Sequence, residues 1–176
     1  GIYKKKDMAT LGRVAEQFLQ LMPGHVDGIG FAFEAFNQTK NYGKAAKYGE
    51  AYYAKKASPM IAQMLASIYY QLKNDSKFID FAQKAVVGKS PKEAFPFNSR
   101  LAEIYIKRKS FGRASRFCQR MLAAYSGSEV PPGFDAGKWR EVKIRNFNII
   151  GKNHYDGKRY SQAVRSFQNT LRLSSR

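Results

Sequence analysis

The sequence predicts an all-α protein, an α-solenoid made of antiparallel helix pairs. Apolar and small residues recur at helical spacing in several separate stretches of the chain. Aromatic residues at matching places in three stretches lie 33 and 36 residues apart: Phe36, Tyr69 and Tyr105. Prolines follow a similar period, with separations of 36 and 32 residues: Pro23, Pro59 and Pro91. A period near ~34 residues is typical of a helical repeat array.

The first expected element is a lone helix over residues 7–22. Leu11, Ala15 and Leu19 hold the apolar positions of a second helix, whose first helix would lie before residue 1. Residues 2–7 look like the end of that lost first helix. We therefore expect a chain that begins inside a repeat, as a fragment of a longer protein.

Four helix pairs are expected to follow. Each pair places Ala or Gly where two helices cross closely, with aromatic residues filling the space beside them. Phe78 in the second pair stands where the other pairs have a small residue. The expected pairs cover residues 26–57, 59–90, 95–125 and 138–173. With the lone helix they form a single repeat domain over residues 1–176.

A segment rich in turn-forming residues separates the third and fourth pairs. Residues 126–137 include Pro131, Pro132 and Gly133 and cannot sustain a helix, so we expect a loop insertion there. Trp139 follows this loop and joins the first helix of the fourth pair. Two roles are open for its side chain, packing under the loop or contact with a ligand.

These stretches resemble the tetratricopeptide repeat (TPR), and the resemblance covers nearly the whole chain outside residues 126–143. The family pattern has a bulky residue, a Leu-small pair and an aromatic residue on one helix, then alternating aromatic residues and Ala on the next. The fourth copy matches best, with Phe147, Ile150, Gly151, Tyr160, Ala163, Phe167 and Leu171. The resemblance implies a right-handed superhelix whose first helices line a concave, ligand-binding side.

Candidate binding residues follow from this resemblance. The expected groove is neutral early in the chain and basic late, with the basic side chains pairing with acidic groups and two tyrosines acting as apolar anchors. The lysine, asparagine and arginine clamp that some members use to bind a C-terminal carboxylate is missing at the corresponding positions. The candidate groove residues are Asn37, Gln63, Tyr70, Arg100, Lys107, Arg145, Asn148, Lys152 and Tyr155.

Charge is the other strong signal. The chain has 31 basic and 13 acidic residues, a net charge of +18. Residues 1–96 carry 14 basic and 8 acidic residues, whereas residues 97–176 carry 17 and 5, and 11 of those 17 are arginine. Such an excess favours an acidic partner, and the planar fork of arginine suits carboxylate or phosphate. We expect a non-catalytic protein–protein interaction scaffold that binds an acidic peptide or protein; the alternative is binding of single-stranded RNA or DNA.

Catalytic and metal-binding patterns do not assemble in this sequence. Cys118 is the lone cysteine and occupies a packing position, so we predict a small buried hydrophobe. Gly88, Lys89 and Ser90 resemble the end of a phosphate loop, but its leading Gly is missing. We expect no enzyme activity, no cofactor and no metal site.

Targeting signals are equally sparse. No run of ~18 apolar residues predicts a membrane span. No signal peptide is visible, and the sequence does not indicate a compartment. Exposed repeat ends make self-association a further expectation.

Overall fold

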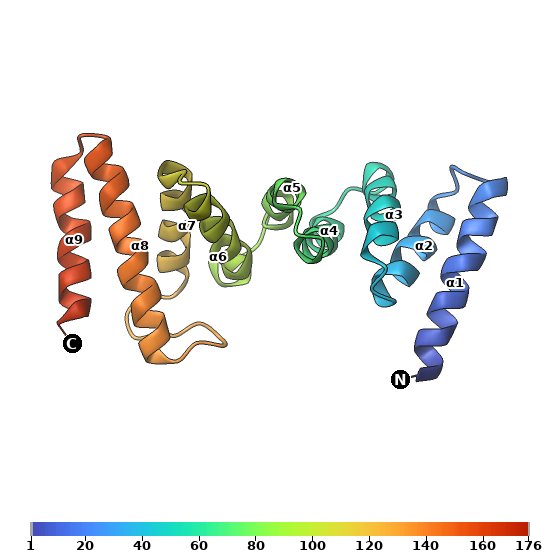
Figure 1. Cartoon of the computed structure of the whole chain (residues 1–176), viewed down its shortest axis with the longest axis horizontal. Helices are drawn as coiled ribbons and strands as arrows, with labels where there is room; N and C mark the ends of the chain where they lie inside the picture. Colours follow the sequence, from blue (N-terminus) through green and yellow to red (C-terminus); the bar gives the residue numbers. More distant parts are fainter. Residues whose placement is uncertain (1, 176) are drawn as a thin grey trace. The chain divides into compact units, whose positions relative to one another are not determined.

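The computed structural model of this protein describes the backbone of residues 2–175 and the side chains of residues 7–175. Helices make up 79% of the structure, and the described residues contain no strand, which confirms the predicted all-α class. The helices (Figure 1) are α1 (Ile2–Leu21), α2 (Val26–Gln38), α3 (Tyr42–Lys55), α4 (Pro59–Gln71), α5 (Asp75–Ala85), α6 (Pro91–Lys107), α7 (Phe111–Ala124), α8 (Ala136–Asp156) and α9 (Tyr160–Ser174).

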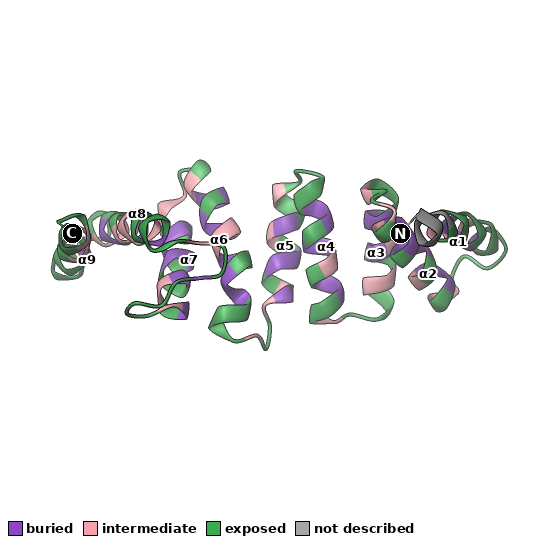
Figure 2. Ribbon diagram, turned by 90° about the horizontal axis from the view of Figure 1, so that it is seen from below, coloured by how far each residue is buried: buried purple, intermediate pink, exposed green. Residues whose placement is uncertain are grey.

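The helices fall into two compact units. Unit 1 is Gly1–Val87 and holds α1 to α5, and unit 2 is Gly88–Arg176 and holds α6 to α9. In unit 1, α2 packs on α3 and α4 on α5, while α6 packs on α7 and α8 on α9 in unit 2. Buried residues alternate with exposed ones along these helices, for example on α4 and α5 (Figure 2). A single unbroken repeat domain over residues 1–176 stays a prediction.

The same tight turn joins the two helices of each pair. A lysine with positive φ occupies it every time: Lys40 (60°), Lys73 (54°), Lys109 (54°) and Lys158 (57°). The N–H of the next residue donates to a carbonyl five residues back, as from Asn74 to Tyr69 at 3.0 Å. This left-handed residue with its backward hydrogen bond is a common way to end a helix. The turn therefore marks the repeat independently of the aromatic residues.

An aromatic stack fills the core of three pairs. The stacked rings are Phe36 with Tyr48, Tyr69 with Phe81, and Tyr105 with Phe117, at centroid distances of 5.7, 5.7 and 5.6 Å. The fourth pair departs from this arrangement. There the ring of Phe167 covers Gly151 so closely that a Cβ on the glycine would lie 2.6 Å from it.

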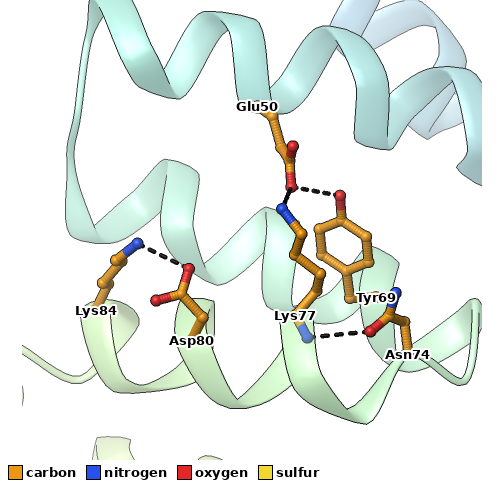
Figure 3. A network of polar contacts seen from close by, with 6 residues as sticks. All are labelled: Glu50, Tyr69, Asn74, Lys77, Asp80 and Lys84. Atoms are coloured by element: carbon orange, nitrogen blue, oxygen red, sulfur yellow. Dashed lines mark hydrogen bonds and ion pairs between the residues drawn. The ribbon is translucent and has the colours of Figure 1, made fainter.

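Carboxylates form ion pairs between neighbouring second helices in unit 1. Glu50 of α3 accepts hydrogen bonds from Lys77 Nζ of α5 at 2.7 Å and from the Tyr69 hydroxyl at 2.6 Å (Figure 3). Burial disfavours the charged form of Glu50, but these two hydrogen bonds outweigh it and hold its pKa below the ordinary value. Glu16 of α1 is held in the same way by Lys44 of α3, at 2.6 Å, and by Tyr48.

Two helix boundaries differ from the sequence predictions. α1 starts at Ile2 and runs unbroken to Leu21, so residues 2–7 form its first turns and do not end a separate helix. The physical reason is that residues 2–7 contain no Gly or Pro, and Gly12, inside α1, does not end the helix. α6 starts at Pro91, four residues earlier than predicted, because Ser90 and Glu93 form a reciprocal capping box and proline suits the first helical position.

The loop that precedes α8 covers a buried tryptophan. Trp139 is 1% exposed, and its ring centroid lies 5.7 Å from that of Phe95, 6.0 Å from Phe134 and 6.3 Å from Tyr125. Phe134 belongs to the loop and Phe95 to α6, so the tryptophan joins loop and helices. Of its two open roles, the structure supports packing under the loop.

Candidate partner-binding surface

The first helix of each pair presents a face that its second helix does not cover. We call this the first-helix face, meaning the exposed side chains of α2 and α4 in unit 1 and those of α6 and α8 in unit 2. All nine sequence-predicted binding residues lie on these four helices.

A hollow of about 460 Å³ lies on the first-helix face of unit 1. Its lining mixes apolar and polar side chains from α2, α3 and α4. Phe31 and Met60 are 54% and 70% exposed there, although both are large apolar residues. The lining residues are Asp27, Gly30, Phe31, Phe33, Glu34, Asn37, Gln38, Tyr52, Met60, Ile61 and Met64.

Glycine at position 30 shapes this hollow. A Cβ on Gly30 would lie 3.0 Å from Cε2 of Tyr52, so the missing side chain lets the tyrosine ring approach α2. The same ring lies 6.3 Å from that of Phe33, which is buried. Tyr52 thus brings the second helix α3 into the lining.

Two carboxylates stand on the rim of the hollow. Asp27 lies 3.7 Å from Lys56 Nζ, which partly balances its charge. Glu34 accepts a hydrogen bond from Gln38 Nε2 at 3.0 Å. The sequence predicts a groove that is neutral early in the chain. In the structure, the hollow of unit 1 is apolar and has two carboxylates on its rim.

The predicted residues of unit 1 are not gathered at one point. Asn37 is half-buried and lines the hollow. Gln63 is exposed on α4, next to the lining residue Met64. Tyr70 lies at the far end of α4, where its ring is 6.2 Å from that of Phe78, a buried residue. Only Asn37 of the three therefore belongs to the hollow.

Basic side chains mark the first-helix face of unit 2. Lys107 and Arg145 are exposed. Arg100 Nη1 lies 2.9 Å from Glu103 one turn along α6, which offsets part of its charge. Lys152 Nζ lies 5.5 Å from the ring centroid of Phe111 on α7. Lys107, Arg145 and Lys152 are therefore exposed, whereas Arg100 is half-buried.

The two remaining predicted residues both contact α9. The Thr170 hydroxyl donates to Asn148 Oδ1 at 3.0 Å. The Tyr155 ring lies 5.7 Å from that of Tyr160 in an edge-on arrangement. Tyr155 nevertheless remains 60% exposed, as an anchor for a partner requires.

Sequence reasoning missed the apolar lining of the unit 1 hollow. The signal was present, because Phe31 and Glu34 are three residues apart and share one side of α2. Met60 and Gln63 share one side of α4 in the same way. The predicted set contains polar, charged and tyrosine residues and does not include these apolar neighbours.

Another hollow, of about 510 Å³, lies between α1 and α3 and is lined in part by Glu16, Lys47 and Tyr48. Glu16 is already bound by Lys44 and Tyr48. The hollow between α2 and α4 is the better candidate, because its exposed apolar side chains are not covered by other parts of unit 1.

Cys118 is fully buried, as predicted. Burial raises the pKa of its thiol to about 11, although the positive charge of Arg145 opposes this change. The thiol is therefore protonated near neutral pH, and a protonated thiol is a poor nucleophile.

The described residues contain neither a metal-ligand cluster nor a membrane-spanning helix. There, no three His, Cys, Asp or Glu side chains group as metal ligands do. No helix in the same part of the chain has the length and apolar character to cross a bilayer.

Known structures share this fold. MamA matches with a TM-score of 0.54 and 16% identity over 98% of this chain and 92% of its own. YrrB, described as a TPR protein with an unusual peptide-binding site, matches with 0.53 and 14% over 98% and 80%. A TPR repeats protein from Bacteroides fragilis matches with 0.55 and 11% over 97% and 83%. No protein-family model and no curated protein matches the sequence.

These likenesses define the class of fold. The chain has a TPR-type fold, an α-solenoid of antiparallel helix pairs, as the sequence predicted. At identities of 16% and below, the likeness concerns the fold, and function must be argued from the surface.

Proposed function

We propose that this protein is a non-catalytic scaffold that binds a polypeptide partner on its first-helix faces. The observation that carries the proposal is the unit 1 hollow, where Phe31 and Met60 stay exposed in a concave site. Large apolar side chains exposed in a concavity are typical of binding sites, because their burial on binding is favourable. The peptide-binding site of YrrB, a structural neighbour, supports the same class of function.

The partner is proposed to carry apolar side chains and carboxylates. Apolar side chains would enter the hollow, with Asn37 at its edge to bind the peptide backbone. Carboxylates would pair with Lys107, Arg145 and Lys152 on the face of unit 2, with Tyr155 as an apolar anchor. The net charge of +18 would speed the approach of such a partner.

A peptide selection tests this proposal. The purified chain is used to select binders from a random-sequence display library, and the affinity of the enriched peptides is then measured by fluorescence anisotropy. We expect peptides rich in large apolar residues and Asp or Glu. Replacing Phe31 and Met60 together by Glu should weaken their binding at least ~10-fold, or about 1.4 kcal/mol.

The matched control is Val14→Glu with Val87→Glu, because both are exposed apolar residues outside the hollow and the net charge changes equally. Peptides that bind the Phe31→Glu, Met60→Glu variant as tightly as the original chain would contradict the proposed site. Single-stranded nucleic acid is the alternative ligand. An oligonucleotide that displaces the selected peptides in a Tyr70- and Tyr155-dependent way would favour that alternative.

A further inference from the structure

An arginine stripe runs along the exposed side of α7. Its members are Arg113, Arg116 and Arg120, all exposed and spaced three and four residues apart. That spacing places them on one side of a helix, with the outer two about 10 Å apart along its axis. α7 contains no acidic residue. The stripe belongs to a second helix and is thus separate from the first-helix face.

Buried rings support two of these arginines. Arg113 Cζ lies 5.6 Å from the ring centroid of Tyr105, and Arg120 Cζ lies 5.5 Å from that of Phe117. These two rings form the aromatic stack of the third pair. The contacts hold the guanidinium groups in place before any partner binds. Since both rings are buried, they cannot stack with the bases of a ligand.

The charges of the stripe are not neutralised within the described part of the chain. There, no carboxylate lies within ion-pair distance of Arg113, Arg116 or Arg120. Lys44 and Lys77 hold the place of Arg113 in earlier pairs, and each is bound to a glutamate 28 or 27 residues before it. At those distances before Arg113 the sequence has Ala85 and Val86.

The surrounding sequence strengthens the positive field. Between Glu103 and Glu129 the chain has six basic residues and no acidic one. Three of the six form the stripe, and the other three are consecutive at the end of α6 and in the turn after it: Lys107, Arg108 and Lys109. An excess of positive charge in one part of the chain attracts polyanions.

The chemistry of α7 decides which polyanion fits. No large apolar side chain of α7 is exposed. Protein partners bind mainly through buried apolar and aromatic anchors, which this surface does not offer. Phosphate groups of a nucleic acid need only positive donors, and arginine binds them through two parallel hydrogen bonds. We propose that the arginine stripe binds the phosphate backbone of a nucleic acid without reading its sequence.

Salt dependence tests this proposal. Binding of a labelled, mixed-sequence single-stranded DNA of about 20 nucleotides is followed by fluorescence anisotropy at several salt concentrations. Each phosphate contact contributes about −0.7 to the slope of log affinity against log salt. The variant with Arg113, Arg116 and Arg120 all replaced by Gln should therefore have a slope about 2 units shallower.

Four further measurements make the result specific. Replacing Lys40, Lys47 and Lys55 by Gln removes the same charge from exposed positions elsewhere and should leave the slope unchanged. Arg116→Gln alone, which disturbs no aromatic contact of Arg113 or Arg120, should reduce the slope by about 0.7 even if the triple variant unfolds. Circular dichroism checks that each variant keeps its helices. The variant with Glu at Phe31 and Met60 should bind the DNA normally, which separates this proposal from the scaffold.

Two results would overturn the proposal. One is a slope that stays unchanged in both stripe variants, or that becomes shallower by the same amount in the lysine control. Either outcome would show that net charge alone attracts the DNA. The other is stripe-dependent binding of polyglutamate with no binding of DNA, which would assign the surface to an acidic protein.

Discussion

Lys77 Nζ lies 2.7 Å from Glu50 Oε1, and this ion pair joins α5 to α3 across neighbouring helix pairs. The pair of Lys44 with Glu16 repeats it one step earlier in the chain, at 2.6 Å. Each glutamate also accepts a hydrogen bond from a tyrosine hydroxyl. Unit 1 thus has a polar link between successive pairs in addition to its apolar core.

The first prediction concerns the pH dependence of this link. The pKa of Glu50 is lowered in the folded chain from an ordinary value of 4.5. Its contribution to stability is therefore present above about pH 4.5 and is lost as the pH falls through the lower, folded-state pKa. Glu50→Gln should flatten the loss of stability in that acidic range. Urea unfolding at a series of pH values measures this, and identical pH profiles would contradict it.

A double-mutant cycle measures the strength of the same ion pair. The variants are Glu50→Gln, Lys77→Met and the two together. Both side chains are partly exposed, so we expect a coupling free energy of only about 0.2–1 kcal/mol. A coupling of zero would show that the tyrosine contact and the apolar core alone join the pairs.

The next prediction compares two glycines of α3. A Cβ on Gly49 would lie 2.7 Å from Leu65 and from Phe33, which are both buried, whereas nothing lies within 4 Å of a Cβ on Gly43. Gly49→Ala should destabilise the fold by about 1–3 kcal/mol through overpacking. Gly43→Ala should stabilise it by about 0.5–1 kcal/mol, since alanine favours a helix. Urea unfolding measures both, and equal effects of the two changes would contradict the close packing at Gly49.

Trp139 gives a prediction about the loop. Trp139→Ala should cost about 3–5 kcal/mol, because it empties the space between Phe95 and Phe134. Trp139→Phe keeps a ring there and should cost clearly less. Limited proteolysis should also cut residues 126–135 faster in the alanine variant. A loss below about 1 kcal/mol for alanine would mean that the loop does not depend on this ring.

The basic face of unit 2 is tested by charge reversal. Arg145→Glu combined with Lys152→Glu should weaken binding of an acidic peptide about 10-fold, because attraction becomes repulsion. Lys55→Glu with Arg165→Glu changes the net charge equally at other exposed positions and serves as the control. If the two double variants lose affinity to the same degree, only net charge matters and the assignment of Arg145 and Lys152 is wrong.

Much of the fold was predictable because one packing unit recurs. Phe36, Tyr69 and Tyr105 repeat at a near-constant period, and each is buried in the aromatic stack of its own helix pair. The start of α6 was misplaced although Ser90 and Glu93 carry a capping signal three residues apart. The start of α1 was misplaced because apolar spacing locates a packed face and not the point where a helix begins.

The candidate site was less predictable than the fold. The family resemblance indicates that first helices line the binding side, and all nine predicted residues fall on first helices. The sequence pattern of a single helix does not indicate where two helices and a side chain from a third helix enclose a hollow. The approach of Tyr52 to Gly30 depends on how α3 packs on α2, which single-helix patterns do not show. Single-helix patterns also do not show which charged side chains form ion pairs, as Arg100 does with Glu103.

Hydrogen exchange of the chain with a bound selected peptide tests the scaffold proposal most directly. Amide protection is compared along all helices with and without the peptide, at saturating concentration. The proposed function predicts slower exchange on α2 and α4 around Phe31 and Met60, and on α8 around Arg145 and Lys152, with α5 and α7 unchanged. Protection confined to the second helices, or spread evenly over the chain, would contradict it.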